Sequence, residues 1–134
     1  MKFIKTLTIG LIILGFNSTF AQNMGGEGVY ELRTYVTNDG KLDDLHARFN
    51  DHTIGLFEKH GIENIGYWVP VDTPNTLIYI IKHHSKEAAE KSWSDFINDP
   101  AWKVVAEESN KNGQILAKAP ESVFMTETTY SMLK

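Results

Sequence analysis

The chain has 134 residues, of which 42% are apolar and 22% are charged, which is enough for one domain rather than two. Its formal net charge is −4 and no basic stripe is present, so the charge argues against nucleic-acid binding. Because the sequence has no cysteine, disulfides, thiolate metal sites, a cysteine nucleophile and covalent haem attachment through a cysteine pair are excluded.

Residues 1–21 have the three-part layout of a secretory signal peptide. Lys2 and Lys5 give a positive start, an apolar run follows, and small residues lead up to Ala21. The apolar run is about ten residues long, short of the roughly 20 that a membrane anchor needs, although an uncleaved anchor is the alternative. We expect cleavage after Ala21, a mature chain from Gln22 to Lys134 and a periplasmic or secreted bacterial location, with no membrane association after cleavage.

The mature chain predicts a lead-in followed by one domain. Residues 22–28 hold three glycines and no apolar periodicity, which indicates a flexible lead-in, and the domain is expected over residues 29–130. Residues 29–36 are rich in β-branched and aromatic types and predict a strand. Apolar residues then recur at three-, four- and seven-residue steps over 41–60, which predicts a helix that stops at Gly61.

The second half of the domain predicts a hairpin, two helices and a last strand. Residues 62–71 and 76–83 predict two strands joined by a short turn, and the second is apolar on both faces and therefore central. Ser85 is a plausible N-cap for a helix that ends at Asn98, before Asp99-Pro100. A further short helix is expected over about 101–110 and a fourth strand over 122–130.

The order β-α-β-β-α-β is that of an α+β, ferredoxin-like domain. Such a domain has a four-stranded antiparallel sheet with its helices packed on one face. The other face needs a cover, because Val29, Tyr35, Ile78 and Ile80, or their neighbours, would otherwise lie in water. A second copy of the chain would supply that cover, so we expect a homodimer through the sheet faces.

Several segments resemble those of one known family, the NIPSNAP family. The matching pieces are YELRTYV (30–36), GKL (40–42), HTIGLFEKHGIENIGYW (52–68) and WSDFINDPAW (93–102), which occur in the family's order and spacing. The resemblance implies a dimeric α/β barrel of the ferredoxin-like superfamily. Related barrels include haem-degrading enzymes, cofactor-free monooxygenases and peroxidases, so the resemblance also implies a small apolar, planar or quinone-like ligand.

Two histidines on the first predicted helix are candidates for chemistry. At about 100° per residue, His52 and His60 both fall beside the apolar stripe and can reach the helix–sheet interface. An imidazole there can act as a general base or as a ligand of haem or a metal. The two lie about 12 Å apart along the axis, too far to share one metal, so no metal site is expected. For His60 a structural role at the helix C-terminus is favoured, and His52 remains the candidate catalytic residue.

Three polar residues alternate on one face of the first strand. Glu31, Arg33 and Tyr35 share that face, and a buried arginine needs an anion or carbonyl groups around it. One interpretation is a buried or dimer-interface ion pair between Glu31 and Arg33. The other is that Arg33 binds an anionic ligand group while Tyr35 donates a hydrogen bond to it.

An aromatic set is open to two interpretations as well. Its members can line a pocket for a flat ligand, or they can simply form the core: Tyr67, Trp68, Trp93, Phe96 and Trp102. Asp99 and Pro100 are read as structural, with Asp99 capping the following helix and Pro100 in its first turn.

Two classes of function follow. The first is a small-molecule binder, or an oxygenase-like enzyme, with a pocket between helices and sheet; its ligand-binding residues would be Arg33, Tyr35, His52 and Trp68. The second is a non-catalytic homodimeric interaction module. No cofactor and no metal are expected in either case.

Overall fold

The computed structural model describes residues 28–133. The expected signal peptide and nearly all of the lead-in lie outside these residues. Four strands form one antiparallel sheet in the order β2-β3-β1-β4: β1 (Val29–Val36), β2 (Glu63–Trp68), β3 (Thr76–His83) and β4 (Glu121–Met125). This order confirms the predicted ferredoxin-like α+β fold, and β3 is central as its apolar faces predicted.

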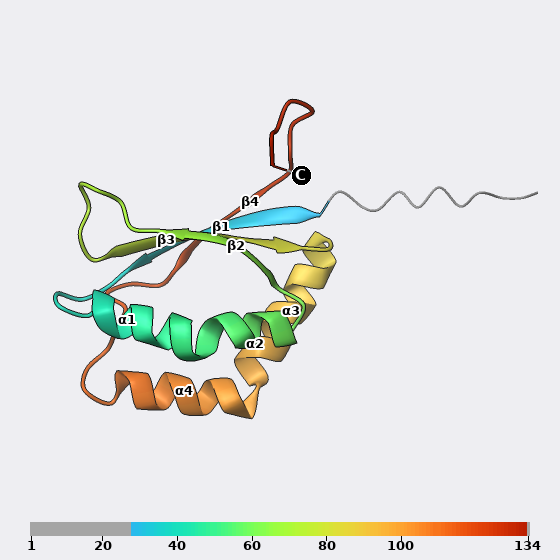
Figure 1. Ribbon diagram of the computed structural model, residues 1–134. Helices are drawn as coiled ribbons and strands as arrows, with labels where there is room; N and C mark the ends of the chain where they lie inside the picture. Colours follow the sequence, from blue (N-terminus) through green and yellow to red (C-terminus); the bar gives the residue numbers. More distant parts are fainter. Residues whose placement is uncertain (1–27, 134) are drawn as a thin grey trace, which may run out of the picture.

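All helices lie on one side of the sheet (Figure 1). The first runs without a break through α1 (Leu42–Arg48), a π-helical turn η1 (Phe49–Thr53) and α2 (Ile54–Lys59). It is followed, after the hairpin, by α3 (Lys86–Asn98) and α4 (Pro100–Asn110). Helix α4 lies beside α1 and α2, on their side away from the sheet (Figure 1). Within residues 28–133, no helix combines the length and apolar character that crossing a membrane requires.

Local chemistry explains where the helices begin and end. The Ser85 hydroxyl accepts a hydrogen bond from the Ala88 N–H at 3.0 Å, which confirms the predicted N-cap of α3. Asp99 accepts one from the Ala101 N–H at 2.8 Å and caps α4, whose first residue is Pro100. Helix α2 stops at Gly61, which has a φ of 74° that a residue without a Cβ adopts easily.

The core lies between the sheet and the helices. Alternate residues of β3 face the helices and are almost fully buried, among them Leu77, Tyr79 and Ile81. Tyr35, expected on the face that needs a cover, lies instead in this core, with its ring centroid 5.3 Å from that of Tyr79. The opposite face of the sheet carries other apolar residues that are only partly covered: Leu32, Val36, Ile78, Ile80, Val123 and Met125.

Two strands are shorter than predicted. Strand β2 ends at Trp68 rather than at residue 71, because Pro70 has no N–H to offer the ladder. Strand β4 ends at Met125 rather than at residue 130, since its last partner is Tyr30 and β1 begins only one residue earlier. Beyond Met125 the chain leaves the sheet and rises on the side opposite the helices (Figure 1).

Candidate functional site

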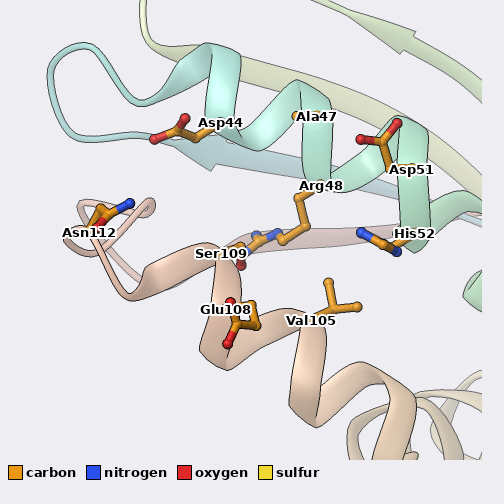
Figure 2. Close-up of a pocket in the computed structure, with 9 residues that line it drawn as sticks. All are labelled: Asp44, Ala47, Arg48, Asp51, His52, Val105, Glu108, Ser109 and Asn112. Carbon is orange, nitrogen blue, oxygen red and sulfur yellow. The ribbon is translucent and has the colours of Figure 1, made fainter.

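A groove of about 300 Å³ lies between α1–η1 on one wall and α4 on the other (Figure 2). It is a groove between helices and not the helix–sheet pocket that the sequence predicted. Its lining is charged and polar apart from one alanine and one valine. The residues are Asp44, Ala47, Arg48, Asp51, His52, Val105, Glu108, Ser109 and Asn112.

Arg48 is the unusual member of this lining. Its side chain runs from α1 into the gap between the two walls (Figure 2), and the residue is only 6% exposed. Its Nε has no hydrogen-bond partner, and the guanidinium forms no ion pair with any of residues 28–133. Its Cζ lies 5.4 Å from the ring centroid of Trp102, within range of a cation–π contact. Burial lowers the pKa of Arg48, and the nearby Tyr35 and Tyr79 side chains partly oppose that shift.

The carboxylates of the groove are engaged elsewhere. Asp44 pairs with Lys41 at 2.9 Å, and Glu108 pairs with Lys111 at 2.7 Å. Asp51 accepts a hydrogen bond from the Asn50 amide at 2.9 Å, and its carboxylate is turned away from the groove (Figure 2). Arg48 is therefore a buried cation that the described part of the chain leaves without a counter-charge.

The π-helical turn determines which residues face the groove. The Ile54 N–H bonds to the Phe49 carbonyl, and the Thr53 hydroxyl donates to the Arg48 carbonyl at 3.1 Å, both across five residues. Thr53 rather than His52 therefore follows Arg48 by one turn. The prediction that His52 reaches the helix–sheet interface is wrong: His52 is exposed and lies at the gap between α1–η1 and α4 (Figure 2).

Contacts at both ends hold the two walls together. At one end, Asp99 at the start of α4 accepts hydrogen bonds from Lys59 Nζ at 2.6 Å and His60 Nε2 at 2.7 Å. These hydrogen bonds, with that from the Ala101 N–H, hold the pKa of Asp99 well below its usual range. At the other end, Lys41 Nζ donates to the Asn112 carbonyl at 3.2 Å. His60 thus has a structural partner at the C-terminus of α2, as favoured from the sequence.

Arg33 belongs to a different cluster, centred on Glu31. Glu31 is 1% exposed, and its two oxygens accept four hydrogen bonds from three strands and α3. The donors are Arg33 Nη1 (2.9 Å), Ser122 Oγ (2.6 Å), His83 Nε2 (2.8 Å) and Trp93 Nε1 (2.7 Å). Burial alone would raise the pKa of Glu31, but the hydrogen bonds and the charge of Arg33 outweigh it and lower the pKa to about 2.

The contacts of this cluster show the orientation of the Arg33 side chain. The Glu31–Arg33 pair faces the helix layer, and the guanidinium lies 4.6 Å from the ring centroid of Trp93. Arg33 and Tyr35 do not line the groove that contains His52, so the sequence prediction that Arg33 and His52 share one pocket is wrong. Next to Arg33, the buried Tyr79 hydroxyl has no hydrogen-bond partner, and burial raises its pKa well above the usual value.

Trp68 lies at a second, more apolar groove. This groove, of about 260 Å³, runs between α1–η1 and the ends of β2 and β3, and it is lined by His46, Phe49, Asn50, Ile54, Tyr67, Trp68, Val69 and Leu77. The indole of Trp68 lies over Gly66, where an added Cβ would meet it at 2.5 Å. Trp68 is 53% exposed. It is therefore a surface residue, separate from His52 and Arg33.

The remaining aromatic residues pack on one another. Trp93 and Phe96 lie edge to face with their centroids 5.7 Å apart, and Phe96 lies 4.5 Å from Trp102. Among residues 28–133, no group of three or more His, Asp or Glu side chains is arranged to hold a metal ion.

Comparison with known proteins agrees with this architecture. A family model described as NIPSNAP matches residues 30–132. A NIPSNAP family protein of unknown function from Agrobacterium tumefaciens is 22% identical, with a TM-score of 0.69 over 81% of this chain and 95% of that one. An uncharacterized NIPSNAP-like domain protein from Burkholderia xenovorans is 14% identical, with a TM-score of 0.68 over 78% of this chain and 89% of that one.

More distant structures share only the fold. A candidate antibiotic biosynthesis monooxygenase from Nitrosomonas europaea is 8% identical, with a TM-score of 0.58 over 79% of this chain and 95% of that one. A search of curated proteins gave no match.

Proposed function

The chain belongs to the NIPSNAP family, and we propose that it binds a small molecule in the groove between α1–η1 and α4. The observation that carries this proposal is Arg48, a cation that is 94% buried, faces the groove and lacks a partner within residues 28–133. Keeping such a group uncompensated costs stability, so its presence is better explained by a ligand than by folding. A π-helical turn beside it supports this explanation, because such turns occur frequently at functional sites.

The groove favours a small ligand with a planar or apolar body. Its volume lies at the lower limit for sites that enclose organic ligands, so it suits a small molecule better than a haem. Ala47 and Val105 offer apolar surface, and the His52 imidazole can donate or accept a hydrogen bond. An oxygenase-like reaction would use His52 as the base. The shared fold with a candidate monooxygenase supports that finer proposal only by analogy.

Filling the groove tests the binding proposal. Val105→Trp places a bulky ring in the groove, whereas Val104→Trp places the same ring on the adjacent, 61% exposed position of α4. Protein purified from its own compartment is examined by native mass spectrometry for a bound small molecule. We expect a ligand on the parent and on Val104→Trp but not on Val105→Trp. A ligand-free parent, or equal retention by both variants, would contradict the proposal.

A homodimeric interaction module is the second candidate function, and the uncovered sheet face favours it. That face carries six partly covered apolar residues, and Val123 is 53% exposed. Val123→Glu should therefore convert a dimer to a monomer in light scattering at micromolar concentration, while Val104→Glu on α4 should not. A parent that is already monomeric would refute the dimer.

Export to the periplasm or beyond the cell is part of the same proposal. It is supported by the signal-peptide layout of residues 1–21. The intact mass of the exported protein should correspond to a chain that starts at Gln22. A mass that includes Met1 to Ala21 would contradict export with cleavage.

A further inference from the structure

We infer that the ligand of the groove is a small organic monoanion whose carboxylate pairs with Arg48. This inference rests on the proposed binding function and goes further by naming the chemical class of the ligand and the residue that recognises it. Arg48 was not among the site residues that the sequence suggested.

The guanidinium of Arg48 has no counter-charge within residues 28–133. A buried guanidinium is stable only when a carboxylate or another acceptor compensates it. Three carboxylates line the same groove, yet Asp44 and Glu108 pair with lysines and Asp51 bonds to its neighbour. An anion from outside the described chain would supply the missing partner.

The surroundings of the guanidinium favour a carboxylate over other anions. The Cζ of Arg48 lies over the ring of Trp102, 5.4 Å from its centroid, and the guanidinium forms no ion pair within residues 28–133. A planar carboxylate matches such an edge with two parallel hydrogen bonds. The apolar groups of Ala47 and Val105 lie in the same groove and can cover the body of an organic acid, which inorganic phosphate lacks.

The charge of the rim limits the ligand to one negative charge. Arg48 is the only lysine or arginine among the residues that line the groove, and the chain as a whole carries a net charge of −4. A second carboxylate on the ligand would find no further lysine or arginine in the lining, and the nearby Lys41 and Lys111 are already paired with Asp44 and Glu108. A neutral polar group at the other end of the ligand would instead meet His52, which can serve either as donor or as acceptor.

Calorimetric titration with defined probes tests this class. We expect 2-naphthoate to bind to the purified full chain roughly tenfold or more tightly than 2-naphthamide, which has the same shape without the charge. Naphthalene-2,3-dicarboxylate and inorganic phosphate should both bind more weakly than 2-naphthoate. Arg48→Met should abolish the preference for 2-naphthoate over the amide, and Arg48→Lys should keep part of it.

Urea unfolding of the ligand-free variants provides a readout that binding alone would not give. If Arg48 is present for a ligand, Arg48→Met should unfold at the same or a higher urea concentration than the parent, because it removes an uncompensated buried charge. A lower midpoint, or failure to fold, would show that Arg48 is structural and would overturn the inference.

The outcomes also separate this inference from the proposed function. Equal binding of 2-naphthoate and 2-naphthamide, both blocked by Val105→Trp, would overturn the anion class and leave binding in the groove intact. Absence of 2-naphthoate binding at millimolar concentration would overturn the inference as well. Loss of the co-purified ligand in Val105→Trp would still support the proposed function in that case.

Discussion

Replacing Glu31 by glutamine changes one atom in the middle of the buried cluster, and the structure shows what that atom does. The amide nitrogen must take the place of one carboxylate oxygen. In the parent, one oxygen accepts from Arg33 and Ser122, and the other accepts from His83 and Trp93. The N–H groups of the amide would therefore point at one or the other of these two pairs of donors. Either orientation opposes donor to donor and leaves a buried guanidinium without its charge partner. Breaking a buried pair in this way costs about 3–5 kcal/mol.

The acid dependence of stability gives an independent magnitude for the same group. The pKa of Glu31 is lowered from 4.5 to about 2 in the folded state. Between these values the unfolded carboxyl binds a proton and the folded one does not, so acid favours unfolding. The contribution of Glu31 is therefore complete above about pH 5, is lost as the pH falls toward 2, and amounts to about 3 kcal/mol.

Urea unfolding at a series of pH values measures both quantities. At pH 7 the free energy of unfolding of Glu31→Gln should be lower than that of the parent by about 3 kcal/mol or more. Between about pH 5 and pH 2 the variant should lose less stability than the parent, because this carboxyl no longer titrates. A pH 7 difference below about 1 kcal/mol, or equal losses in acid, would refute the reasoning.

Further predictions concern the helices and the sheet surface. Trp93→Phe keeps the ring packing and removes one donor to the buried carboxylate, so it should cost about 1–2 kcal/mol in chemical denaturation; Trp93→Ala should cost about 3 kcal/mol or more. Trp102→Ala should cost less than Trp93→Ala, because both rings are partly buried but only that of Trp93 donates a hydrogen bond to Glu31. Asp99→Ala should lower the Tm by more than Asp99→Asn, because asparagine still caps α4. Gly66→Ala should displace the indole of Trp68 from the sheet and change tryptophan fluorescence with β2 still formed.

The fold was predictable because its signals are local and periodic. The apolar run of β3, the Ser85 cap and the Asp99-Pro100 junction each indicate their structure within a few residues. The end of β4 was less predictable, because it depends on where its partner β1 begins. The element order alone then led to the ferredoxin-like arrangement.

The groove escaped prediction because of the π-helical turn. A projection at about 100° per residue places His52 beside the apolar stripe and Arg48 further from it. A signal was nevertheless present. The buried residues Leu45, Phe49, Thr53 and Phe57 follow one another at strict four-residue steps. In an α-helix this spacing drifts by about 40° per step, and a wider turn is one way to keep all four residues on the core side.

Tertiary packing places the residues that the sequence suggested for one site in different parts of the fold. Arg33 and His52 lie on neighbouring elements and each has an evident chemical use, but only packing decides that Arg33 meets a buried glutamate. No spacing rule connects Glu31 with Ser122, which lies 91 residues further along the chain. Contacts of this range depend on the finished sheet and not on any local pattern.

The contacts at the two ends of the groove have a consequence for the kinetics of binding. The start of α4 is tied to the end of α2 through Asp99, and the other end is tied through Lys41 and Asn112. With both ends fixed, the walls cannot swing apart like a hinge, and a ligand enters from the open side of a site that is already formed. Association should therefore occur in one step, and its observed rate in stopped flow should rise linearly with ligand concentration without reaching a plateau.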